Sequence, residues 1–163
     1  MCPMSLHDLN KLVVAGLLAA CGIAACAHGQ VLTPGEIGRS GSRQFAASED
    51  KVFYASVGAL KVEGYDVETA DVEKGVIITK PKVVRANARM TPNGSASQAQ
   101  FIEYQRRYRV TVVPENGGTR VIAEPSLAKG DRDISKDEVW DLNGPDGEKV
   151  QWDNLFDDIK SAF

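Results

Sequence analysis

Side chains that could perform catalysis or hold a metal ion are unevenly spread along this sequence. All three cysteines lie within the first 26 residues, and both histidines lie within the first 28. The remainder of the chain therefore has no thiol and no imidazole. This rules out a disulfide framework, a Cys/His zinc site and a Ser-His or Cys-His nucleophile pair there. We expect a protein that is not an enzyme and that uses no cofactor and no metal ion.

The early cysteines indicate a different chemistry, which is attachment to lipid. An apolar run follows Lys11 and continues to Ala27. It is too short for a transmembrane helix, which needs about 20 residues, but it suits the centre of a secretion signal. Leu18-Ala19-Ala20-Cys21 resembles the lipobox of bacterial lipoproteins, in which the cysteine is acylated and becomes the first residue of the mature chain. We predict a lipoprotein signal peptide over residues 1–20 and lipidation of Cys21.

Three other outcomes stay open for this N-terminus. Ile23-Ala24-Ala25-Cys26 is a second lipobox match, so Cys26 is the alternative lipidation site. Ala25-Cys26-Ala27 also fits ordinary signal cleavage, which would release a soluble periplasmic protein. An apolar N-terminal helix that is never cleaved is the third outcome.

The residue after the cysteine bears on the destination of the protein. In enteric bacteria an aspartate at this place tends to hold lipoproteins at the inner membrane, whereas Gly22 follows Cys21 here. Several acyl chains on one cysteine anchor stably, because each buried methylene contributes about 0.8 kcal/mol. We expect a lipid-anchored protein of the cell envelope, at the outer membrane and facing the periplasm. A soluble periplasmic location is the alternative.

Composition divides the rest of the chain into a linker and a domain. Apolar residues make up 43% and charged residues 25%, as in soluble globular proteins, and the formal net charge of -3 does not suggest binding to nucleic acid. Residues 21–47 are rich in glycine and serine without a sustained period. They predict a flexible tether, of which a twenty-residue Gly-rich stretch would span roughly 25 Å. Residues 48–163 are enough for one α+β domain with a single core.

Two amphipathic helices are predicted at the ends of this domain. Ser48 can cap the first helix with its hydroxyl, and Phe53, Val57 and Leu60 then recur on one face. The second helix begins at about Glu148. Its large apolar side chains share one stripe, at Trp152, Leu155, Phe156, Ile159 and Phe163.

Alternating apolar and polar residues predict four strands between these helices, over residues 65–70, 76–79, 101–113 and 119–124. Residues 82–100 are small and polar, and we expect a long, mobile loop there. The predicted fold class is α+β, with a four-stranded antiparallel sheet in the order α-β-β-β-β-α. The N-terminal and the C-terminal helix pack on one face of this sheet.

The longest predicted strand carries the candidate binding surface. Basic and aromatic side chains interleave along it, at Tyr104, Arg106, Arg107, Tyr108 and Arg109. In an exported protein such a strip suits anionic lipid, lipopolysaccharide or peptidoglycan. The alternative is a strand whose solvent-exposed face simply carries long basic side chains. Arg106 is the exception, because it falls on the face of the strand that the apolar residues share. A bulge, a sheet edge or a side chain that extends to water would each explain it.

An acidic segment has the spacing of a calcium loop. Oxygen-bearing side chains alternate along it, at Asp131, Asp133, Ser135 and Asp137. Lys136 stands where such a loop needs glycine, and Leu142 stands where it needs a bidentate glutamate. We therefore interpret this segment as a solvated acidic loop.

The order of these motifs resembles the BamC-like (helix-grip) domain of small bacterial envelope lipoproteins. The resemblance rests on Gly64-Tyr65, on the strand from Gly75 to Thr79 and on the helix from Trp152 to Ile159, all behind a lipobox. It covers Ser48 to Phe163, which is one such domain. It implies an envelope-assembly role, and the family has no catalytic residue to transfer.

Together these patterns predict a non-enzymatic, membrane-anchored envelope lipoprotein that serves as a binding or assembly module in the outer membrane or periplasm. Its expected partners are the membrane, through N-terminal acyl chains such as palmitate, and an envelope protein. The alternative is a periplasmic small-ligand or lipid-binding protein with a cavity between helix and sheet. A cavity with convergent polar groups would favour the alternative, and an exposed apolar patch would favour a protein partner.

Overall fold

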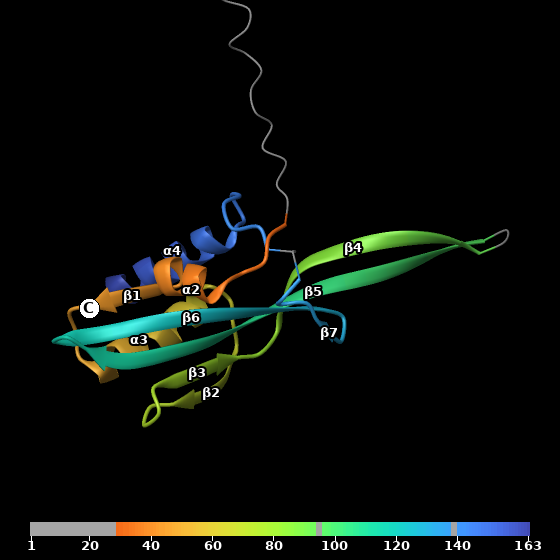
Figure 1. Cartoon of the computed structure of the whole chain (residues 1–163). Helices are drawn as coiled ribbons and strands as arrows, with labels where there is room; N and C mark the ends of the chain where they lie inside the picture. Colours follow the sequence, from red (N-terminus) through yellow and green to blue (C-terminus); the bar gives the residue numbers. More distant parts are fainter. Residues whose placement is uncertain (1–28, 94–95, 138–139) are drawn as a thin grey trace, which may run out of the picture.

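The computed structural model describes residues 29–93, 96–137 and 140–163, which are coloured in Figure 1. The predicted signal peptide and both candidate lipidation sites, Cys21 and Cys26, lie outside the described residues. In chain order the elements are α2 (Pro34–Ser40), β1 (Ser42–Phe45), α3 (Glu49–Val62), β2 (Val67–Asp71), β3 (Val76–Thr79), β4 (Lys82–Asn93), β5 (Ala96–Glu115), β6 (Gly118–Lys129), β7 (Arg132–Asp133) and α4 (Glu148–Ser161).

The strands form one antiparallel sheet, with the order β1-β6-β5-β3-β2. Two further strands lie off this path, because β4 pairs with β5 and β7 pairs with β6. The expected four-stranded sheet with two helices is therefore wrong. Within the described ranges the fold is α+β with seven strands and three helices.

Residues 34–45 were assigned to the flexible tether, and this assignment is wrong, because they form α2 and β1. A capping box starts α2. The backbone N–H of Glu36 donates to the Thr33 hydroxyl at 3.2 Å, and the Glu36 carboxylate accepts the Thr33 N–H at 2.9 Å. Strand β1 pairs with β6 and buries Phe45. The domain therefore begins well before Ser48.

The mobile loop expected over residues 82–100 is also wrong, because this stretch forms β4 and the start of β5. The two strands pair from Lys82 opposite Arg106 to Asn93 opposite Ala96. Figure 1 shows this β4–β5 hairpin projecting beyond the rest of the sheet, without a helix over it. A two-stranded ribbon that meets water on both faces needs no apolar alternation, so the sequence pattern does not mark it.

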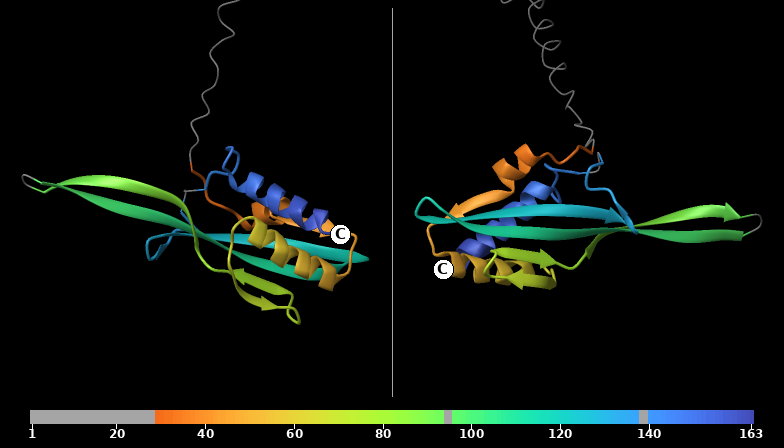
Figure 2. Two further views of the ribbon diagram at one scale, coloured as in Figure 1. Left: turned by 180° about the vertical axis from the view of Figure 1, so that it is seen from behind. Right: turned by 60° about the horizontal axis from the view of Figure 1, so that its bottom comes forward.

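Both predicted helices are confirmed, as are the four predicted strands. Helix α3 has Ser48 at its N-cap position, although the hydroxyl makes no capping hydrogen bond, and Gly64 follows its end with a φ of +77°. Helix α4 begins at Glu148. Figure 2 shows α3 and α4 side by side on one face of the sheet.

The main core lies between these two helices and the sheet. Trp152 is fully buried at its centre, and its indole N–H donates to the Ala123 carbonyl at 3.0 Å. A Cβ placed on Gly41 would lie 2.9 Å from the indole ring, so the backbone before β1 packs directly on Trp152. The segment ahead of α3 is thus part of the core.

The turn between β2 and β3 lies very close to strand β5, and this contact can be tested. Gly75 has a φ of +61°, and a Cβ added there would lie 2.1 Å from the Val112 carbonyl oxygen. Gly117 has a φ of +81°, but a Cβ there would meet no atom within 4 Å. Both Gly→Ala variants incur left-handed backbone strain, and Gly75→Ala must also displace β5. We expect Gly75→Ala to lower the free energy of unfolding by roughly 1–3 kcal/mol more than Gly117→Ala, measured with urea. Equal losses would contradict the close approach.

Candidate functional site

Two opposite charges occupy apolar positions where β5 meets α4. Arg106 points to the helix-covered face of β5, and Glu148 is the first residue of α4. The Glu148 side chain is 0% exposed and the Arg106 side chain 12%, and Arg106 Nε lies 3.4 Å from Glu148 Oε2. Neither atom has a hydrogen-bond partner among the described residues. Their mutual attraction therefore offsets part of the cost of burying each charge.

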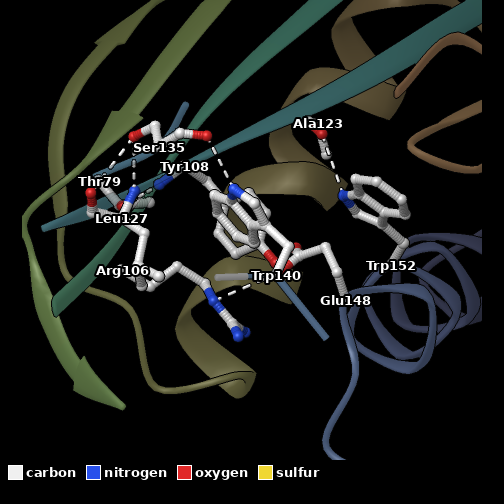
Figure 3. A network of polar contacts seen from close by, with 9 residues as sticks. All are labelled: Thr79, Arg106, Tyr108, Ala123, Leu127, Ser135, Trp140, Glu148 and Trp152. Atoms are coloured by element: carbon white, nitrogen blue, oxygen red, sulfur yellow. Dashed lines mark hydrogen bonds and ion pairs between the residues drawn. The ribbon is translucent and has the colours of Figure 1, made fainter. Parts of the chain in front are cut away.

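Tyr108 joins this ion pair into a small polar network, which Figure 3 shows beside Trp140. The Tyr108 hydroxyl donates a short hydrogen bond to Glu148 Oε1, and its backbone N–H donates to the Thr79 hydroxyl at 2.9 Å. The ring of Tyr65 meets the ring of Tyr108 edge-on, with 5.2 Å between centroids. These side chains join β5 to three other parts of the domain, which are β3, the start of α4 and the segment after α3.

Burial determines how these groups ionise. It raises the pKa of the Glu148 carboxyl, and the charge of Arg106 and the hydrogen bond from Tyr108 lower it in part. Burial, followed by the charge of Glu148, raises the pKa of the Tyr108 hydroxyl well above its ordinary value. Burial also raises the pKa of Tyr65. Tyr108 therefore keeps its proton at neutral pH and acts as a donor to Glu148.

A pocket of about 590 Å³ opens beside the ion pair, where the β4–β5 hairpin leaves the sheet. Strands β4 and β5 line one side of it with Lys82, Arg85 and Arg106. The segment before α4 lines the other side, with Trp140 and Asp146 among its residues. The pocket thus combines three cationic side chains, two aromatic rings and two carboxylates, which are groups that can orient a bound ligand.

A second, smaller core supports this pocket. Its buried members are Leu127, Ile134, Trp140 and Leu142. The indole N–H of Trp140 donates to the Ser135 carbonyl at 2.8 Å. The backbone of Trp140 also forms two hydrogen bonds with Gln30, of 3.0 and 3.1 Å. The chain therefore enters the domain along the wall of the pocket.

The predicted basic aromatic strip does not form one surface, because strand alternation divides it between two faces. Tyr104 and Arg106 line the pocket, and Tyr108 is buried beneath the helices. Arg107 forms an ion pair of 2.8 Å with Glu68 of β2, and Arg109 is exposed. Three of the five residues of the expected strip thus belong to the pocket and core, and the other two lie on the face that no helix of the described residues covers.

Of the explanations considered above for Arg106, the structure contradicts the bulge in its own strand and the sheet edge. The strand irregularity near it belongs to β4, between Val83 and Arg85, while β5 continues regularly through Arg106. Arg106 also has paired strands on both sides, so it does not lie at an edge. Its charge is accommodated by Glu148 and by the opening of the pocket.

Two carboxylates of the acidic segment bind neighbouring groups of the same segment. Asp133 accepts the N–H of Ser135 at 2.8 Å and the Ser135 hydroxyl at 2.5 Å, and these hydrogen bonds lower the pKa of Asp133. Asp137 pairs with Arg132 at 3.0 Å. In the part of the chain that the structure describes, no group of three or more His, Cys, Asp or Glu side chains is placed to hold a metal ion.

The sequence pattern left unassigned the partner of Arg106, which is Glu148, and two cations of the pocket, Lys82 and Arg85. Glu148 carried a signal, because it stands four residues before Trp152 and so falls on the apolar stripe of α4. A glutamate on that stripe and Arg106 on the apolar parity of β5 together indicate a buried ion pair. Lys82 and Arg85 had no such signal, since they lie within the stretch that was expected to be a loop.

Comparisons with known proteins place this chain in no family. No protein-family model and no curated protein matches it. Among solved structures it is similar to a DUF4468 family protein from Bacteroides ovatus, with 15% identity, a TM-score of 0.39 and coverage of 74% of this chain and 83% of the other. We draw neither family membership nor function from this likeness, and the resemblance to helix-grip lipoproteins stays a prediction. Among the described residues, no helix has the length and apolarity needed to cross a bilayer.

The buried carboxyl predicts a pH-dependent stability. Because folding raises the pKa of Glu148, the folded protein binds this proton more tightly than the unfolded chain. The stability from this group is therefore complete below about pH 4 and is lost as pH rises through the folded-state pKa. Glu148→Gln keeps the shape and removes the titration. We expect wild type to lose stability relative to Glu148→Gln between pH 4 and 7, measured by urea unfolding.

The control for this experiment is Glu73→Gln, which removes one carboxylate from an exposed turn. Its stability relative to wild type should change much less over the same pH range. A difference between wild type and Glu148→Gln that is constant with pH, or that moves in favour of wild type, would contradict the prediction.

Proposed function

We propose that this protein is a non-enzymatic lipoprotein of the cell envelope, which acyl chains on Cys21 hold at the outer membrane. The domain then acts as a binding or assembly module for an envelope partner. The lipobox sequence Leu18-Ala19-Ala20-Cys21 supports the anchor. The β4–β5 hairpin supports the binding role.

The hairpin is the observation that carries this proposal. Beyond the pocket the hairpin consists of two strands only. Within the described residues, the edge of β4 that faces away from β5 pairs with no other strand, and the same holds for the edge of β5 that faces away from β4, up to Ile102. Large apolar side chains on it are exposed, with Val83 at 48%, Val84 at 39% and Phe101 at 72%. A lone two-stranded ribbon is marginally stable, and unpaired edges with apolar side chains favour contact with another chain. A partner that covers the hairpin would bury this surface.

The pocket at the root of the hairpin favours a second candidate function. A periplasmic protein that binds a small ligand needs a cavity of this size with a few convergent polar groups. The pocket of about 590 Å³ with Lys82, Arg85 and Arg106 offers both. In this second candidate function, the domain binds a small ligand in the pocket and not a protein partner at the hairpin.

Replacing Phe101 tests the hairpin as a partner site. Phe101→Ser removes an exposed aromatic side chain from the hairpin, and Val62→Ser removes an apolar side chain that is 75% exposed on α3, outside the hairpin. We expect the lipidated wild type and Val62→Ser to retain the same envelope protein in a detergent extract, and Phe101→Ser to lose at least about nine-tenths of it. Equal retention by both variants, or retention of no protein, would contradict the hairpin role.

Metabolic labelling with a palmitate analogue tests the anchor. We expect the label on wild type and on Cys26→Ala, and its loss from Cys21→Ala, because the thioether at residue 21 starts the acylation. Intact-mass measurement of the same proteins locates the new N-terminus. A label that persists in Cys21→Ala and disappears from Cys26→Ala would move the site to Cys26. An unmodified, soluble product would rule out the anchor.

A further inference from the structure

The pocket lies at the end of the domain where the chain enters. Gln30 is hydrogen-bonded to Trp140, which lines the pocket. Only nine residue steps separate Gln30 from Cys21, so even a fully extended segment spans at most about 32 Å. An acyl anchor on Cys21 would therefore keep Gln30, and the pocket wall beside it, within a few tens of ångströms of the lipid headgroups.

The charges that line the pocket are unequal. Glu148 already balances Arg106, whereas no carboxylate of the described residues lies within ion-pair distance of Lys82 or Arg85. On the opposite side, Asp141 turns its carboxylate to its own loop, where it accepts the Gly144 N–H at 2.9 Å. Asp146 is exposed at the rim. Lys82 and Arg85 are thus the cations of the pocket lining that have no carboxylate partner among the described residues.

Lys82 and Arg106 are also held in place, whereas Arg85 is exposed and borders only the Tyr104 ring. The Lys82 ammonium donates to the Glu63 carbonyl at 2.6 Å and lies 4.8 Å from the centre of the Tyr65 ring. The Arg85 guanidinium lies 5.8 Å from the centre of the Tyr104 ring. Arg106 is held by Glu148, as Figure 3 shows. Side chains positioned in this way lose less conformational freedom when they bind an anion.

We propose that this pocket binds a phosphate group through Lys82, Arg85 and Arg106. Arginine forks and a lysine ammonium are the side chains that recognise phosphate oxygens. The apolar wall formed by Leu127 and Trp140 accommodates the carbon part of a phosphate ester. The inference rests on the proposed function, because the anchor brings the pocket close to phospholipid headgroups. A free phosphate ester offers the same chemistry.

Two probes and one matched pair of variants test this inference. The protein is the mature chain from residue 21, prepared without acyl groups, at physiological salt. One probe is glycerol 3-phosphate in solution, followed by calorimetry. The other is sedimentation with vesicles of phosphatidylglycerol mixed into phosphatidylcholine, against pure phosphatidylcholine. Arg85→Gln removes a pocket cation, and Arg109→Gln makes the same charge change at an exposed position outside the pocket.

We expect Arg85→Gln to weaken binding about tenfold, as for loss of one charge-assisted contact, and Arg109→Gln to weaken it less than about twofold. Binding of both probes that depends on Arg85 identifies a phosphate site open to free esters. Binding of the vesicles alone that depends on Arg85 identifies a headgroup site.

Equal weakening by the two variants would mean general attraction to the protein surface and would overturn the inference, as would the absence of binding to both probes. Unfolding midpoints of the two variants show that the exposed substitutions leave the fold intact. Because these measurements use protein without acyl groups, their failure leaves the labelling of Cys21 as a separate test of the proposed function.

Discussion

The ion pair between Arg106 and Glu148 is the constraint on which the arrangement of the domain depends. Removing an ion from water costs several kcal/mol, and a buried pair recovers this cost only when both partners are in place. A shift of α4 by one residue would turn Glu148 away from Arg106 and leave two uncompensated charges. Apolar side chains in their places could be equally stable. We therefore infer that the pair fixes the position of α4 along β5 rather than adding to the free energy of unfolding. It specifies where α4 begins over β5.

Arg106 also marks the point at which β5 changes its surroundings. Toward the end of β5, Tyr108, Val110 and Val112 alternate inward and are buried under the helices. Toward its start, Phe101 lies in the hairpin, where Figure 1 shows no helix over either face. The charge stands at the boundary, with its Nε facing a buried carboxylate and its side chain lining a pocket. One strand therefore serves both the core and the hairpin, and the pocket lies where the two meet.

The elements that could be predicted from the sequence are those that bury an apolar face. Helices α3 and α4 and strands β2, β3, β5 and β6 all contact the main core, so their periodicity is visible. Strand β1 has four residues and buries only Phe45, and β4 belongs to a ribbon without a covered face, so neither leaves a periodic signal. Arg106 was recognised as exceptional, but its partner was not, because Glu148 was considered only as the start of a helix. The pocket depends on β4 and so could not be predicted without it.

The early start of the domain changes what an anchor on Cys21 would do. A tether that extended to residue 47 would let the domain turn freely and reach well away from a membrane. The Gln30–Trp140 bridge instead fastens the chain beside the pocket, while Figure 2 shows the C-terminus at the end of the domain away from the hairpin. An anchor on Cys21 would therefore join the domain beside the pocket and the root of the hairpin, and the C-terminal end of α4 would lie away from this junction. With such an anchor, the segment between the membrane and the domain would be much shorter than a tether that extended to residue 47.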